Sequence, residues 1–129
     1  MFDSDTENAW MRLYKLLVQG IEPFPTLIEE AQALRGSMGH SLLHWLCLEA
    51  EVSVIESAIK AGLRLDVQDD LGNTALMEAV AAGRTEVVAA LVAAGASTSI
   101  VNFDGEDLAD YLELYELVLP DDLLRPGPL

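Results

Sequence analysis

The side chains that could carry catalysis or bind a metal are few in this sequence. His40 and His44 are its only histidines, and Cys47 is its only cysteine. A histidine pair at this spacing needs one helix and a third ligand to bind a metal, and we expect His40 in a turn and His44 inside a helix. We therefore predict no metal site. We expect His44 to be a buried imidazole with a hydrogen-bond partner, and Cys47, at helical spacing from Leu43, to be a buried apolar group.

The 22 Asp and Glu residues form no recognisable catalytic or calcium-binding pattern. A glycosidase needs one carboxyl group shielded from water, whereas we expect these side chains on solvated helix faces and loop tips. Asp66, Asp69 and Asp70 lack the alternating acidic spacing and the distal Glu of a calcium loop. Gly-x-Ser-x-Gly and phosphate-binding glycine motifs are also missing. We predict that the protein is not an enzyme and has no cofactor and no small-molecule substrate.

The composition describes one folded, strongly acidic domain. Seven Lys and Arg against 22 Asp and Glu give a formal net charge of −15, which repels nucleic acid and anionic lipid. Hydrophobic residues make up 51% of the 129 residues, enough for one core. A single cysteine allows no intrachain disulfide, no apolar run reaches about 18 residues, and the first residues lack the basic end of a signal peptide. We predict a cytoplasmic protein with no nucleic-acid or membrane partner.

The negative charge is densest towards the C-terminus. Eight acidic residues follow one another there with no Lys or Arg between them: Asp104, Glu106, Asp107, Asp110, Glu113, Glu116, Asp121 and Asp122. Such a field can keep a protein soluble, or it can steer the approach of a basic protein. Composition does not separate these two interpretations.

An internal repeat organises the elements that position these residues. Gly39, Gly72 and Gly105 recur at intervals of 33 residues, and Gly62 and Gly95 are separated by the same interval. A fixed period of this length indicates a solenoid. Within each copy, apolar residues recur at three- and four-residue spacing in two short segments, which predicts a pair of helices followed by a polar loop.

The second copy resembles the ankyrin repeat. The family's positions are occupied here by Gly72, Thr74, Leu76, Ala79, Gly83, Val87, Val88, Leu91, Gly95 and Ala96. Ala75 and Met77 replace the usual Pro and His. The first copy keeps Ser41, Leu43, His44, Val54, Ile55 and Gly62, with Ala50 in place of the interhelix glycine. The resemblance covers residues 35–119 well and 4–34 weakly. It implies an all-α fold, a short α-solenoid of ankyrin-type helix pairs with loop-tip turns, in which His44 hydrogen-bonds the backbone of a neighbouring loop.

We expect residues 1–129 to form a single ankyrin-repeat domain with five parts. Residues 4–34 are an atypical N-terminal capping pair, in which a capping box at Ser4–Glu7 opens a helix from about Asp5 to Gln19 and a second helix covers Thr26–Leu34. Residues 35–68 and 69–101 are repeats. Residues 102–120 are a C-terminal partial repeat with a helix over Asp107–Leu119, and residues 121–129 are a tail.

The expected binding positions follow from the resemblance, since ankyrin repeats contact partners through loop tips and the outer positions of each first helix. They map here onto Met38, His40, Glu49, Asp70, Leu71, Asn73, Phe103, Asp104, Glu106 and Tyr115. Phe103 either serves as an exposed anchor or folds back onto Tyr111 or Tyr115.

We therefore predict a non-catalytic protein-binding module, monomeric before binding, whose acidic concave face captures and inhibits a basic partner protein. An immunity protein that neutralises a toxin is one example. The alternative is a generic scaffold, adaptor or chaperone-like ankyrin protein in which the charge serves only solubility.

Overall fold

The computed structural model describes residues 4–119, and these form seven α-helices without a β-strand. The helices are α1 (Ser4–Val18), α2 (Pro25–Ala33), α3 (Leu42–Glu49), α4 (Val52–Lys60), α5 (Ala75–Ala81), α6 (Thr85–Ala93) and α7 (Leu108–Leu114), and a 3₁₀ turn, η1, covers Ser37–Gly39. The all-α solenoid predicted from the sequence is confirmed.

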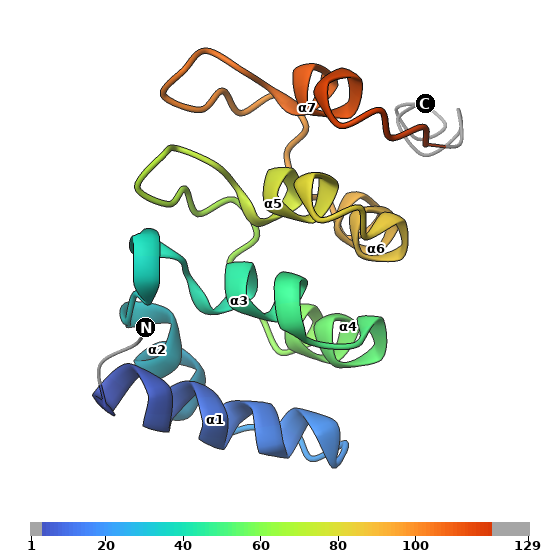
Figure 1. Ribbon diagram of the computed structural model, residues 1–129. Helices are drawn as coiled ribbons and strands as arrows, with labels where there is room; N and C mark the ends of the chain where they lie inside the picture. The colour runs from blue at the N-terminus through green and yellow to red at the C-terminus, as the bar shows by residue number, and fades with distance from the viewer. Residues whose placement is uncertain (1–3, 120–129) are drawn as a thin grey trace.

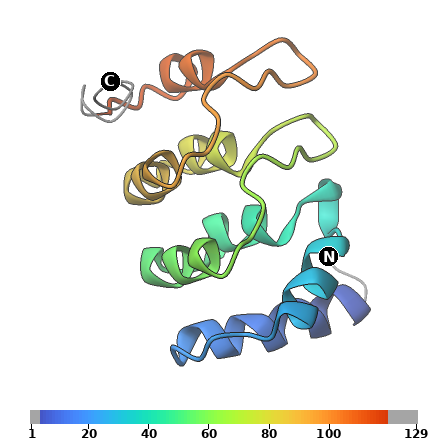
Figure 2. The ribbon, with the colours of Figure 1, turned by 180° about the vertical axis from the view of Figure 1, so that it is seen from behind.

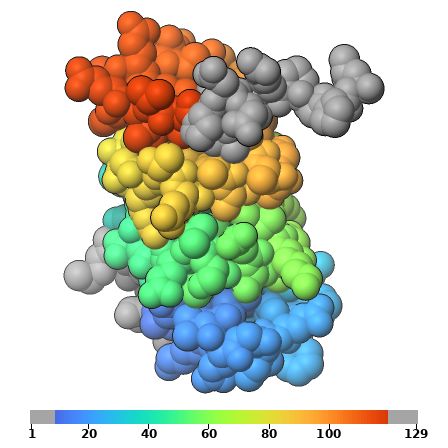
Figure 3. Space-filling view, turned by 90° about the vertical axis from the view of Figure 1, so that its right-hand side faces the viewer, coloured from blue at the N-terminus to red at the C-terminus, as the bar shows by residue number. Residues whose placement is uncertain are grey.

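Helices α1–α6 form three successive pairs, α1 with α2, α3 with α4 and α5 with α6, and α7 follows as a single helix among the described residues. Helix α3 packs on α5, and α5 packs on α7, while α4 packs on α6 in a second row. The loops that lead into α5 and α7 project to the same side of the stack, away from α4 and α6 (Figure 1). The same layering is visible from behind (Figure 2), and the space-filling view shows successive layers in direct contact (Figure 3). One side of the protein is therefore built from loop tips.

The core lies between the layers and consists mainly of aliphatic side chains and alanine. Leu43, Leu46, Leu76 and Leu91 are almost completely buried, and Ala79 allows the helices to approach closely because it has no side chain beyond Cβ. Close approach of neighbouring layers is what lets the polar loops above the helices reach one another. Alanine in these helices therefore serves packing as well as helix propensity.

The N-terminal pair seals the stack through an aromatic contact. Trp10 of α1 is fully buried, and its indole N–H donates a hydrogen bond to the carbonyl oxygen of Ala31 in α2 at 2.9 Å. The Trp10 ring also lies 5.9 Å from the ring of Trp45 in α3, between centroids. One side chain therefore joins α1 to α2 and to the next layer. The side chains of the capping box predicted at Ser4–Glu7 lie outside the described part of the structure.

The predicted helix over Asp107–Leu119 is too long, because α7 ends at Leu114. Glu116 takes a left-handed φ of 54°, and the Leu117 N–H donates to the carbonyl oxygen of Leu112 at 2.9 Å. This is the hydrogen-bond pattern that closes many helices, usually with glycine in the left-handed position. Since Glu occupies that position here, the residue types give no stop signal. Pro120 and the tail at 121–129 lie outside the described residues.

The loop tips are joined to one another by backbone hydrogen bonds in a repeating register. The Asp70 N–H donates to the Met38 carbonyl oxygen at 3.0 Å, and the Phe103 N–H donates to that of Leu71 at 3.1 Å. Gly72, with φ +83°, lies in the loop before α5, at the point where the loop before α7 approaches it. A Cβ atom added at Gly72 would be 2.7 Å from the Phe103 nitrogen. Neighbouring repeats therefore touch through main chain as well as through side chains.

Gly72→Ala is expected to destabilise the protein more than Gly105→Ala, its equivalent one repeat later. Gly105 has a similar φ of +82° but open space around it, so Gly105→Ala should lower the free energy of unfolding by about 1–2 kcal/mol through the backbone alone. Gly72→Ala should lose a further ~1–3 kcal/mol because the Phe103 loop must move. Urea denaturation followed by circular dichroism measures both, and equal losses would contradict the close approach.

Candidate functional site

A buried hydrogen-bond network links the base of each loop to the next repeat, and His44 is its first member. The ring of His44 is fully buried at the start of α3, where Nδ1 accepts from the Ser41 N–H at 3.1 Å. Nε2 therefore carries the proton, and it donates to the carbonyl oxygen of Asn73 in the following loop at 2.8 Å. The backbone hydrogen bond implied for His44 by the resemblance is confirmed.

Burial lowers the pKa of His44 below 6.5, mainly because the charged imidazolium loses its hydration, although the bond to Asn73 opposes the shift. A lowered folded-state pKa means that the unfolded chain binds the proton more tightly. The contribution of His44 to stability is therefore complete above pH 6.5 and falls as the pH drops below that value. His44 acts as a neutral structural group.

His44→Gln is expected to reduce the free energy of unfolding at pH 7.5 by about 1–3 kcal/mol, because Ser41 and Asn73 each lose a buried partner. The difference in free energy of unfolding between the two proteins should shrink between pH 6.5 and 5. In that range only the protein with His44 loses stability, because its unfolded chain takes up a proton on this ring more readily than its folded state does. Denaturant unfolding at several pH values measures it. A constant difference across that range would show that His44 does not titrate differently in the two states.

Asn73 was predicted as a contact residue, but the structure places it inside the network. Its side chain is only 4% exposed, and its Oδ1 accepts from Asn102 Nδ2 at 2.9 Å and from the Tyr111 hydroxyl at 3.1 Å. Its own amide donates to a Glu78 oxygen at 3.2 Å. Asn73 is therefore a link between repeats and not a surface side chain, because it lies at the base of the loop, directly before Thr74, the N-cap of α5.

Cys47 lies in α3 as a buried apolar group. The thiol is fully buried, and desolvation raises its pKa to about 12, although nearby Arg84 opposes the shift. A thiol with this pKa carries almost no thiolate at neutral pH, and thiolate is the nucleophilic form.

We expect Cys47 to react with a thiol reagent such as dithionitrobenzoate only through unfolding or local opening. In native buffer the rate should be at least about a thousandfold below that of the protein in 6 M guanidinium chloride, a factor well inside the folding equilibrium constants of small domains. Rapid stoichiometric modification of the folded protein would show that the thiol is accessible.

Seven of the ten predicted contact residues have exposed side chains, in two rows. The loop tips carry Met38, Asp70, Leu71, Phe103 and Asp104, and the C-terminal ends of α3 and α7 carry Glu49 and Tyr115. Phe103 is 72% exposed, which fits the exposed anchor and not the alternative of folding back onto Tyr111 or Tyr115. Those two rings pack on each other instead, with centroids 5.5 Å apart. Glu106 is half-buried and accepts from Asn102 Nδ2 at 3.1 Å.

His40 is also half-buried, and it lies in a polar cluster that sequence reasoning missed. Its Nε2 is 3.3 Å from Asp69 Oδ2 and 3.9 Å from Glu78 Oε1, on the next loop and on α5. Desolvation raises the pKa of Glu78, and the nearby charge of Asp69 adds to the shift. Asp69 precedes Asn102 by 33 residues, so the two are equivalent polar positions of successive repeats. Comparing polar as well as apolar positions of the repeats would have indicated Asp69 as a member of a polar cluster.

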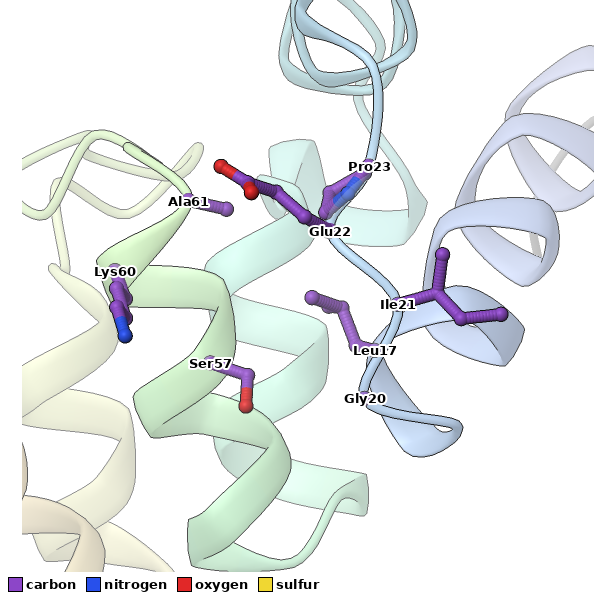
Figure 4. A pocket seen from close by; sticks show the side chains of 8 residues that line it. All are labelled: Leu17, Gly20, Ile21, Glu22, Pro23, Ser57, Lys60 and Ala61. Carbon is purple, nitrogen blue, oxygen red and sulfur yellow. The ribbon is translucent and has the colours of Figure 1, made fainter.

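A concave pocket of about 280 Å³ lies away from these residues, between α4 and the segment that joins α1 to α2. Leu17 and Ser57 face the space between them, with Lys60 on α4 and Glu22 on the opposite segment, whereas Ile21 points away (Figure 4). The lining combines short apolar side chains with one cation and one carboxylate. The Ser57 hydroxyl donates to the carbonyl oxygen of Ser53 at 3.1 Å, which is a hydrogen bond within α4.

Comparison with known proteins identifies the repeat. A family model described as ankyrin repeats in three copies matches residues 12–102, which is more than half of the chain and includes most of the N-terminal helix pair. No curated protein matches the chain. Among the described residues, no helix is long and apolar enough to cross a bilayer.

Proposed function

Because the chain belongs to the ankyrin-repeat family, whose repeats are generally non-enzymatic and indicate a protein–protein interaction module, we propose that it captures a basic protein and inhibits it by occlusion. The observation that carries this proposal is the row of exposed apolar side chains on successive loop tips, with carboxylates beside them. Neutralisation of a toxin, as by an immunity protein, is the form of inhibition that a small acidic binder suits.

The apolar part of the proposed surface consists of Met38, Leu71 and Phe103. Each is exposed, and each stands on a different loop tip of the same side of the stack. The backbone bonds between the tips hold them at fixed spacing, so little conformational freedom is lost when a partner covers them. Such pre-ordered apolar anchors are the usual energetic centres of protein interfaces.

Charge supplies the second argument. Asp70 and Asp104 are exposed beside these anchors, and Glu49 is exposed at the end of α3. The ten predicted contact residues include four carboxylates and no Lys or Arg, within a chain of net charge −15. A field of this sign accelerates the encounter with a positively charged protein and repels acidic competitors. We therefore propose a basic surface on the partner.

We expect the association rate with the partner captured from the producing cells to fall at least about tenfold between low and high ionic strength. The double variant Asp70→Asn/Asp104→Asn should associate more slowly at low salt. Phe103→Ala should leave the association rate unchanged and raise Kd by about thirtyfold, through faster dissociation. Surface plasmon resonance measures both rates.

The matched control is Glu56→Gln/Glu86→Gln, which removes two exposed carboxylates from α4 and α6, on the side of the stack away from the loop tips. It should leave the interaction nearly unchanged. Equimolar protein should abolish the partner's activity. An association rate that ignores salt, together with a partner that stays active in the complex, would support the scaffold or adaptor function instead.

A further inference from the structure

Three metal-ligating side chains converge between the first two repeats. His40 lies between η1 and α3, Asp69 lies in the loop before α5, and Glu78 lies in the first turn of α5. One nitrogen or oxygen atom from each lies within 4.8 Å of the other two. The site therefore joins two neighbouring repeats, with His40 and Asp69 separated by 29 residues in the sequence.

Two of these atoms are buried without a hydrogen-bond partner among the described residues: His40 Nε2 and Asp69 Oδ2. The Asp69 side chain is 0% exposed, and its other oxygen accepts from the N–H groups of Leu71 and Asn73, both at 2.9 Å. These two bonds hold the carboxylate with Oδ2 facing His40. His40 Nε2 lies 3.3 Å from this oxygen without forming a hydrogen bond with it. A buried carboxylate oxygen that accepts no hydrogen bond is costly, so the place suits a cation.

The equivalent positions one repeat later carry a different set of side chains, which hydrogen-bond to one another. His40, Asp69 and Glu78 correspond to Asn73, Asn102 and Tyr111 under the 33-residue shift. There Asn102 Nδ2 and the Tyr111 hydroxyl both donate to Asn73 Oδ1, at 2.9 and 3.1 Å. The neutral triad closes on itself through hydrogen bonds.

The triad of His40, Asp69 and Glu78 consists instead of an imidazole and two carboxylates. His40 Nε2 lies 3.3 Å from Asp69 Oδ2 and 3.9 Å from Glu78 Oε1, but neither contact is a hydrogen bond, so this triad does not close on itself as the Asn73 triad does. We infer that His40, Asp69 and Glu78 bind a divalent transition-metal ion of the Zn²⁺ type. In a tetrahedral site with bonds of about 2.1 Å, two ligand atoms lie about 3.4 Å apart. The distances from His40 Nε2 to the two carboxylates, 3.3 and 3.9 Å, suit that geometry after small adjustments.

The surroundings favour a cation and position its ligands. Two carboxylates and a neutral imidazole carry a charge of −2, which Zn²⁺ cancels inside a chain that is already strongly negative. Asn73 Nδ2 donates to Glu78, and the His40 ring stacks on His44 with centroids 5.1 Å apart. Supporting contacts of this kind orient metal ligands.

The cluster borders on solvent, because the side chains of His40 and Glu78 are 16% and 19% exposed. A water molecule would complete a four-coordinate site. The imidazole selects transition metals over Mg²⁺ and Ca²⁺, which prefer oxygen ligands. The bound ion ties the first loop to the second repeat and so fixes the spacing of the Met38 and Asp70 tips.

The test is calorimetric titration of the chelator-treated full-length protein with Zn²⁺, together with thermal unfolding in Zn²⁺, Mg²⁺ or Ca²⁺. We expect one Zn²⁺ per chain and a rise in Tm of about 5 °C or more at saturating Zn²⁺, with no comparable shift in the other two ions. Asp69→Asn keeps the oxygen that accepts from the loop, Glu78→Gln keeps the acceptor for Asn73, and His40→Phe keeps the ring stack. Each should raise the Kd for Zn²⁺ at least about tenfold.

Glu56→Gln, which removes an exposed helical carboxylate outside the cluster, is the control and should bind Zn²⁺ like the native protein. Circular dichroism of the metal-free proteins identifies any of the three ligand variants that fails to fold. The variants that do fold decide the outcome. Binding that survives in the folded variants, or an equal affinity for Ca²⁺, would assign the metal to scattered surface carboxylates and overturn the site. So would the lack of any Zn²⁺ binding. The assay needs no partner protein, so its result is independent of the proposed function.

Discussion

The structure depends on one constraint: the polar groups at the base of each loop must find their hydrogen-bond partners in the next repeat. The His44 ring reaches the Asn73 carbonyl oxygen, and the loop tips are joined by the bonds from Asp70 to Met38 and from Phe103 to Leu71. Unpaired polar groups at these buried positions would cost free energy, so the repeats stack only at the spacing that pairs them. The apolar helices below supply the driving force, and the loops supply the register.

That constraint divides the loop side chains into two classes. Side chains that turn towards the stack become internal links, as Asn73 does between Asn102 and Tyr111. Side chains at the tips, such as Leu71 and Phe103, point away from the stack and stay exposed. A rigid row of exposed anchors is thus a consequence of how the repeats are joined, which is why the same architecture serves recognition.

The two triads illustrate how the same register carries different chemistry. Asn73 and Asn102 satisfy each other, because an amide both donates and accepts, whereas Asp69 only accepts and needs a proton or a cation opposite it. The position in the repeat brings these side chains together, and the residue types determine whether they hydrogen-bond to one another or can bind a cation. The net charge of the chain favours cations at such a place as well as basic proteins at its surface.

By itself the sequence determined the period, the helix pairs, and the burial of His44 and Cys47. These features depend on residues close together in the chain or on positions that every repeat shares. Only the tertiary structure decided that Asn73 is internal, that His40 meets Asp69 and Glu78, and that Phe103 stays exposed. Each of those outcomes is set by contacts, or their absence, between side chains about one repeat length apart, which periodicity brings near but does not orient.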